Sequence, residues 1–136
     1  MADRGARQTR AVDGALWTCS ALLGLAILGL SLGRPPDVPG FHFVAADKVG
    51  HVLAYGLLAG TLLLAGMWRP GRGRGVLATP WLVIGPVIVF GGLIEIAQVG
   101  AGRNADGMDL VADALGALGA LAIWTWVRAR AETAPD

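Results

Sequence analysis

The chain has few of the residues on which soluble domains depend. Only 15% of its 136 residues are charged and 54% are hydrophobic, whereas a soluble domain usually carries about a quarter charged residues. It has a single cysteine, Cys19, which excludes a disulfide framework and argues against a cysteine-based metal cluster. Because Cys19 stands inside an apolar run, we expect its side chain to be buried like that of a small apolar residue. Low charge and long apolar runs together predict an integral membrane protein.

The chain also lacks the motifs of several enzyme classes. It contains no H-E-x-x-H zinc helix, no G-x-S-x-G elbow and no P-loop. Ser20 and Ser31 both fall in the first apolar run, away from the polar residues discussed below, which argues against a serine hydrolase. The arginines among glycines at residues 69–74 lack the larger basic surface and stacking aromatics of a nucleic-acid site. No nucleic-acid partner is expected.

Four apolar runs are each long enough to cross a bilayer, at about residues 15–33, 47–67, 80–100 and 109–127. They predict an all-α fold, a four-helix transmembrane bundle over residues 15–127, with polar tails at 1–14 and 128–136. The tails and the middle loop carry most of the basic residues, whereas the other two loops carry only Arg34, Lys48 and Arg103. The positive-inside rule then places both termini in the cytoplasm, with up-down-up-down topology.

Ionisable side chains recur at the outward end of three of these predicted helices. Asp47, His51 and Tyr55 share one face of the second helix because they are spaced four residues apart. With about 1.5 Å of rise per residue, the polar residues of all three helices fall within roughly the outer third of the bilayer. The predicted binding site consists of ten residues: Asp47, Lys48, His51, Tyr55, Glu95, Gln98, Arg103, Asp106, Asp109 and Asp113.

An ionisable residue inside a membrane is a functional-site hypothesis by default. Glu95, His51 and Asp109 are the candidate catalytic residues, since a carboxyl group in apolar surroundings can serve as a general acid or base. His51, Glu95, Asp109 and Asp113 are the candidate metal ligands. Oxygen ligands with one imidazole suit a divalent cation such as Mg²⁺, Mn²⁺ or Ca²⁺.

The alternative interpretation is a structural network that fixes helix register. It would consist of three pairings: Arg103 with Asp106 or Asp109, Lys48 with Asp47, and His51 with Glu95. Small residues support close helix packing, because Gly116 shares the face of Asp109 and Asp113, and Gly91 lies one turn before Glu95. Such small-residue faces also leave open a homo-oligomer or an assembly with other membrane proteins.

Three motifs in this order resemble the VanZ-like integral membrane proteins. They are D-K-x-x-H-x-x-x-Y at 47–55, E-x-x-Q at 95–98 and G-R-x-x-D-x-x-D-x-x-x-D-x-x-G-x-x-G at 102–119. The family pattern often has asparagine where this chain has Asp113. The resemblance implies a multi-pass protein of the bacterial inner membrane tied to the cell envelope, in a family one member of which confers low-level teicoplanin resistance.

Three functions remain open at this stage. The first is binding of a headgroup, from a membrane lipid or a lipid-linked or other cell-wall precursor. The second is a metal-assisted hydrolase or transferase that acts on an outer-leaflet phospholipid or glycolipid. The third is a structural or assembly subunit. A channel or proton pathway is not expected, because only Thr61 and Thr125 carry polar groups toward the cytoplasmic side.

Overall fold

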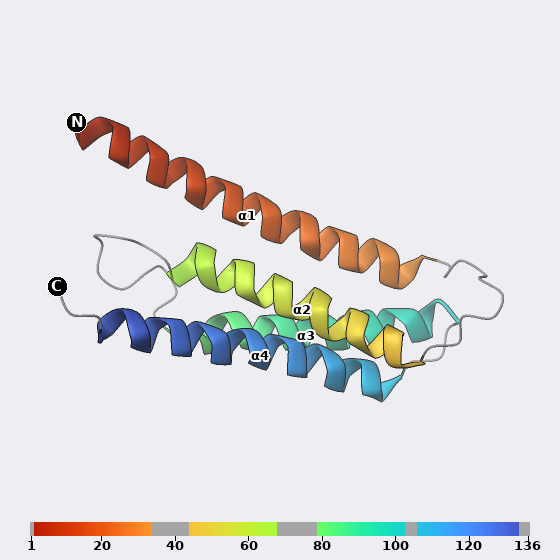
Figure 1. Ribbon diagram of the computed structural model, residues 1–136. Coiled ribbons are helices and arrows are strands. Elements are labelled where there is room, and N and C mark those ends of the chain that lie inside the picture. The colour runs from red at the N-terminus through yellow and green to blue at the C-terminus, as the bar shows by residue number, and fades with distance from the viewer. Residues whose placement is uncertain (1, 34–43, 68–78, 103–105, 134–136) are drawn as a thin grey trace.

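The computed structural model describes residues 2–33, 44–67, 79–102 and 106–133. They form four helices, α1 (Ala2–Leu32), α2 (Val44–Met67), α3 (Trp81–Gly100) and α4 (Gly107–Glu132), shown in Figure 1. All four are long and apolar enough to cross a membrane. The predicted all-α fold with four such helices is therefore confirmed.

Three helices extend beyond their predicted bounds, α2 by three residues at its start and the other two by more. The polar residues assigned to the N-terminal tail continue α1 back to Ala2, and α4 runs past residue 127 to Glu132. Alanine, arginine and glutamine are good helix formers, and no proline interrupts either extension. At the end of α4, Arg128 pairs with Glu132 at 3.2 Å and the Arg130 guanidinium lies 4.0 Å from the Trp126 ring centroid. These local contacts stabilise the last turns of α4, which follow its apolar part.

Proline, glycine and aspartate mark the ends of α3 and α4. Pro80 stands at the N-cap of α3, where the missing N–H of proline matters little. After α3, Gly102 adopts a φ of 75°, the left-handed conformation that commonly follows a helix. Asp106 caps α4, because its carboxylate accepts a hydrogen bond of 2.9 Å from the Met108 N–H.

The helix α2 lies at the centre and packs against the other three. α1 packs against α2 and α3, and the described residues show no packing contact between α1 and α4. Figure 1 shows the N-terminal part of α1 leaning away from the other helices. The hydroxyls of Ser20 in α1 and Thr61 in α2 are joined by a hydrogen bond of 3.0 Å.

The helices α2 and α4 approach each other closely where they cross at Gly56 and Gly116. A Cβ atom on Gly56 would lie 3.3 Å from the Gly116 carbonyl oxygen, and one on Gly116 would lie 2.9 Å from the Gly56 nitrogen. Only glycine allows backbones to approach so closely. The predicted use of Gly116 as a close-packing position is confirmed.

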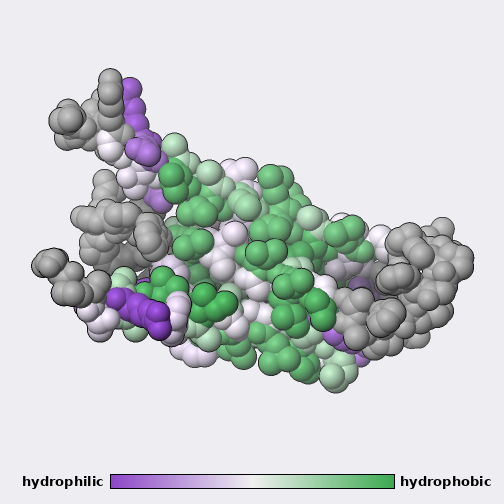
Figure 2. Space-filling model, viewed as in Figure 1, coloured by the Kyte–Doolittle hydropathy of each residue, from purple (hydrophilic) through white to green (hydrophobic). Residues whose placement is uncertain are grey.

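The outer surface of the bundle is apolar. Leu22, Leu30 and Ile96 are all more than half exposed, and Figure 2 shows hydrophobic residues over the middle of the bundle with hydrophilic ones toward its ends. This distribution suits a protein surrounded by lipid. Cys19 is also exposed, so the expectation that it is buried was wrong. The next residue, Ser20, is buried against α2, so Cys19 lies on a face of α1 that α2 does not cover.

Candidate functional site

The polar side chains gather at one end of the bundle, where α1 and α3 end and α2 and α4 begin. Three hydrogen bonds establish this arrangement. The Gln98 side-chain amide donates to the Ser31 carbonyl at 2.9 Å, the Asp106 N–H donates to Glu95 Oε2 at 3.0 Å, and the Lys48 ammonium donates to Asp106 at 2.5 Å. The structure thus brings the polar ends of α2, α3 and α4 together, as the matching depths predicted, and adds the end of α1, which was not predicted.

Lys48 holds the beginning of α4 against the beginning of α2. Its ammonium group hydrogen-bonds to both Asp106 and Asp109 and lies 3.7 Å from Asp47. The predicted pairing of Lys48 with Asp47 is therefore the weakest of three contacts. The hydrogen bond from Lys48, with that from the Met108 N–H, holds the pKa of the exposed Asp106 carboxyl below its ordinary value.

His51 joins α2 to α4 through the buried Asp113. Its Nδ1 atom lies 2.8 Å from Asp113 Oδ1, and Asp113 is only 1% exposed. When Asp113 is ionised its carboxylate can only accept a hydrogen bond, and the ring proton of His51 then lies on Nδ1. The other ring nitrogen, Nε2, then faces Asp109 Oδ2 at 3.8 Å. The alternative pairing of His51 with Glu95 was wrong, since Glu95 binds the backbone of Asp106 instead.

Tyr55 lies one turn deeper than His51 on the same face of α2. The two rings stack with centroids 6.3 Å apart and planes 7° apart. Phe90 of α3 contacts Tyr55 as well, with its ring centroid 6.3 Å from that of Tyr55. Tyr55 is 1% exposed, so its ring is buried between the polar end of the bundle and the apolar interior.

Three buried polar atoms have no hydrogen-bond partner within the described part of the chain. They are Tyr55 OH, Glu95 Oε1 and Asp113 Oδ2, one from each of α2, α3 and α4. Gly91 makes room beside them, because a Cβ atom there would lie 2.6 Å from Asp113 Oδ2 and 3.2 Å from Tyr55 Cε1. The predicted close approach at Gly91 is confirmed. Buried polar groups are normally satisfied, so these atoms mark where a ligand or water would be stabilised.

A possible cation position lies at the outer edge of the same cluster. Ligand atoms of Asp47, His51 and Asp109 all lie within 4.8 Å of one another. The predicted metal set shares His51 and Asp109 with this group. The other two predicted ligands, Glu95 and Asp113, are not in this group. Asp113 is hydrogen-bonded to His51 Nδ1, and Glu95 accepts from the Asp106 N–H.

Ser31 belongs to the site although the sequence pattern did not predict it. Ser31 was placed away from the cluster, yet its carbonyl accepts from Gln98 and ties the end of α1 to α3. Nothing in the pattern pointed to it, since a backbone carbonyl is present in every residue. Arg103, a predicted site residue, lies outside the described residues.

Comparisons of the chain with protein-family models, with curated proteins and with solved structures found no match in any of the three.

Proposed function

We propose that the chain is a VanZ-like protein of the bacterial inner membrane, whose polar end binds the headgroup of a lipid or cell-wall precursor on the outer side. The helices would run up-down-up-down, with both termini in the cytoplasm. Arg7, Arg10, Arg128 and Arg130 support this orientation. They lie toward the ends of α1 and α4 opposite the polar cluster, and basic residues favour the cytoplasmic side. The three sequence motifs support the family.

The observation that carries the proposal is the presence of buried carboxylate oxygens without partners in the described chain. Asp113 is 1% and Glu95 7% exposed. Each leaves one oxygen unbonded there, and the Tyr55 hydroxyl lies near enough to Asp113 to interact with its carboxyl group, so Glu95 Oε1 is the oxygen that most needs an external donor. An ionised group in such surroundings costs several kcal/mol unless something compensates it. A protein that needed these acids only to hold helices together would be expected to satisfy both oxygens internally. A bound polar group supplies the missing donors.

The charge of the cluster indicates which headgroups suit it. Its described members include five carboxylates, those of Asp47, Glu95, Asp106, Asp109 and Asp113, against the ammonium of Lys48. Arg103, outside the described residues, adds one more cation, which still leaves an excess of acids. Negative charge in excess attracts an amine, or a phosphate bridged through a divalent cation, and repels a bare anion. The proposed ligand therefore presents positive charge to the cluster.

Neutralising one acid of the cluster tests the proposal. Glu95→Gln and Asp109→Asn are each expected to weaken headgroup retention about tenfold or more, because a hydrogen bond to a charged group contributes about 1.5–3 kcal/mol. The matched control is Glu132→Gln, a 69% exposed carboxylate at the other end of the bundle. Native mass spectrometry measures the retained molecules after incubation with vesicles of phosphatidylethanolamine, phosphatidylglycerol and a polyprenyl-linked cell-wall precursor.

The structural alternative gives a different result in the same experiment. If the cluster only fixes helix register, both variants lower the unfolding temperature and wild type retains no more headgroup than Glu95→Gln and Asp109→Asn do. A change in teicoplanin susceptibility that follows headgroup retention across the three variants would extend the proposal to the family's resistance phenotype.

A second candidate function is metal-assisted hydrolysis or transfer on an outer-leaflet phospholipid or glycolipid. The specific observation in its favour is the group formed by Asp47, His51 and Asp109. Asp113 supports it, since a metal-binding histidine commonly donates its second ring N–H to a carboxylate. That bond leaves His51 Nε2 directed at Asp109. A divalent cation at this position would polarise a phosphoryl oxygen or a bound water.

Manganese binding tests this second function. Wild type is expected to bind one Mn²⁺ per chain, and His51→Ala should weaken binding by at least about tenfold, the lower bound seen when a metal's supporting shell is disturbed. Electron paramagnetic resonance of Mn²⁺ titrated into the purified protein measures this. Asp13→Asn, which neutralises an acid in α1, is the control. Stoichiometric binding that is identical in His51→Ala would exclude this metal site.

A further inference from the structure

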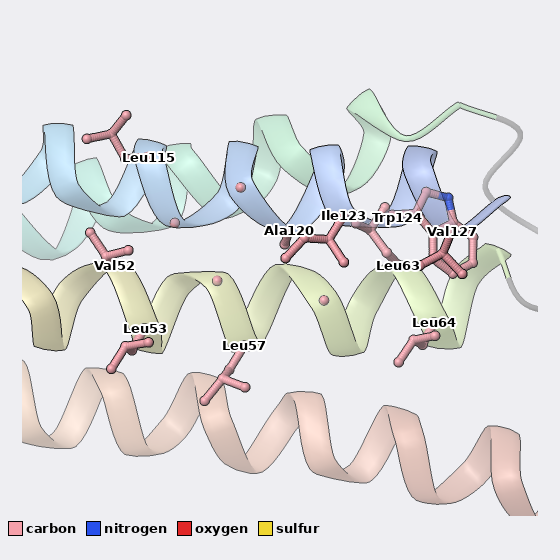
Figure 3. A pocket seen from close by; sticks show the side chains of 14 residues that line it. Val52, Leu53, Leu57, Leu63, Leu64, Leu115, Ala120, Ile123, Trp124 and Val127 are labelled. Carbon is pink, nitrogen blue, oxygen red and sulfur yellow. The ribbon is translucent and has the colours of Figure 1, made fainter. Parts of the chain in front are cut away.

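A pocket between α3 and the first turn of α4 reaches the polar cluster. Its volume is about 420 Å³, and Glu95 is part of its wall. A second apolar cavity, of about 450 Å³, runs between α2 and α4, where Figure 3 shows Leu57, Ile123 and Trp124 among the residues that line it. The described lining of that groove includes no side chain of the polar cluster. The α3–α4 pocket is therefore the cavity that can bring a ligand to the acids.

The α3–α4 pocket combines one carboxyl group with apolar walls. Besides Glu95, its described lining consists of apolar residues and glycines, among them Gly92 of α3 and both Gly107 and Leu110 of α4. Glu95 is the member of this set whose side chain can form hydrogen bonds. A Cβ atom on Gly92 would lie 3.9 Å from Leu110 Cδ1, so the glycine leaves room for a ligand between the helices. The volume is typical of a small-ligand site, about 300–1,000 Å³.

The pocket opens toward lipid. Three of its lining residues, Val89, Leu93 and Ile96, are each more than half exposed and belong to the apolar outer surface of the bundle. On the aqueous side Glu95 is covered by the start of α4, because its Oε2 atom accepts the Asp106 N–H at 3.0 Å. Glu95 also lies about 8 Å below the end of α3, at about 1.5 Å per residue. A ligand in this pocket would therefore come from the surrounding leaflet.

Glu95 requires a donor from outside the described chain. It is 7% exposed, and its Oε1 atom has no hydrogen-bond partner among the described residues. A charged N–H donor suits it best, because such hydrogen bonds to a carboxylate are roughly twice as strong as neutral ones and the cation also compensates a buried negative charge. A lysine on a partner helix would have to carry its charge into the membrane, which is costly. A lipid amine reaches this depth from its own headgroup layer.

We propose that Glu95 binds the primary amine of a membrane lipid, which enters sideways from the outer leaflet between α3 and α4. The ammonium group donates to Glu95 Oε1, and the lipid chains remain in the bilayer beside Val89, Leu93 and Ile96. This deepens the proposed function and rests on it. It assigns the headgroup contact to Glu95, and it selects a membrane lipid over a soluble cell-wall fragment.

Photo-crosslinking with two matched lipids tests the proposal. The protein is reconstituted in phosphatidylcholine vesicles that contain phosphatidylethanolamine with a diazirine near the glycerol end of one chain. The matched probe is phosphatidylcholine with the same diazirine, which keeps the positive charge and has no N–H to donate. We expect the amine probe to label the half-buried Leu110 at least about tenfold more than the choline probe does. Leu30 of α1, which is 82% exposed, reports bulk lipid and should be labelled equally by both.

Three substitutions separate the acid from the pocket. Glu95→Gln should reduce labelling of Leu110 by the amine probe to the level of the choline probe. Gly92→Leu, which fills the pocket from α3, should have the same effect, whereas Gly85→Leu, two turns earlier and outside the pocket, should leave labelling unchanged. Gly107→Leu fills the pocket from α4, where a Cβ atom meets nothing within 4 Å, and serves if Gly92→Leu does not fold. Thermal unfolding in detergent shows which variants are folded.

Several results would overturn the proposal. Equal labelling of Leu110 by both probes in wild type means that bulk lipid or water occupies the pocket. Selective labelling that appears only in Arg103→Gln means that Arg103 supplies the donor. Crosslinks between two copies of the chain through Leu93 mean that protein covers the pocket. Displacement of the amine probe by soluble glycerophosphoethanolamine means that the site opens to water.

Failure of this proposal can be told apart from failure of the proposed function. If headgroup retention in native mass spectrometry is lost in Glu95→Gln but equals wild type in folded Gly92→Leu and Gly107→Leu, the headgroup binds by another route and the lateral pocket is rejected. If retention is unchanged in both Glu95→Gln and Asp109→Asn, the headgroup site itself is rejected.

Discussion

Gly116→Ala is expected to destabilise the protein more than any other single methyl group added to α4. The new Cβ atom would overlap the Val52 carbonyl oxygen and lie 2.9 Å from the Gly56 nitrogen. Both are backbone atoms, so α2 and α4 have to move apart along their whole contact. Overpacking of this kind costs about 1–3 kcal/mol, and occasionally more where the backbone must shift.

Gly119→Ala is the matched control for this substitution, on the same helix one turn later. Its Cβ atom meets nothing within 4 Å, so helix propensity alone would leave stability unchanged or raised by up to about 1 kcal/mol. The free energy of unfolding in mixed detergent micelles measures both variants. Equal stability of the two would show that α2 and α4 do not cross at Gly56 and Gly116.

The second large effect is expected at Asp113, whose replacement by alanine removes the buried partner of His51. The loss leaves the Nδ1–H of a mostly buried ring unsatisfied, which costs about 1–3 kcal/mol, and opens a cavity beside Gly91. Asp113→Asn keeps an oxygen that accepts from His51 and removes a buried charge. It should therefore be at least about as stable as wild type.

The two Asp113 variants also separate hydrogen bonding from charge in the site. The free energy of unfolding should distinguish alanine from asparagine, whereas headgroup retention should fall in both, because both remove the negative charge of Asp113. Headgroup retention equal to wild type in Asp113→Asn would assign the attraction to Asp109 and Glu95 instead. Equal destabilisation by both variants would mean that the charge of Asp113, not its hydrogen bond, holds His51.

The depth of each polar residue along its helix was predicted correctly, whereas the rotation of each helix about its axis was not. Depth along a helix follows from counting residues, because each adds about 1.5 Å. The prediction that Lys48, His51, Glu95 and Asp109 gather at one end was therefore confirmed. Which pairs form depends on how each helix is rotated about its axis, and periodicity within one helix does not specify the neighbour that its face meets. That is why His51 was assigned to Glu95 and is found on Asp113.

The sequence by itself determined the four apolar helices, the shared depth of the polar residues and the need for small residues at Gly91 and Gly116. These follow from hydropathy, helix rise and side-chain size, all of which are local properties. The tertiary structure alone decided that α2 and α4 cross at Gly56 and Gly116, which brings His51 to Asp113 and Lys48 to Asp109. It also decided which polar atoms have no partner among the described residues and that an apolar groove lies between α2 and α4. Both depend on distances between helices, because a hydrogen bond or a groove exists only once two chain segments have met.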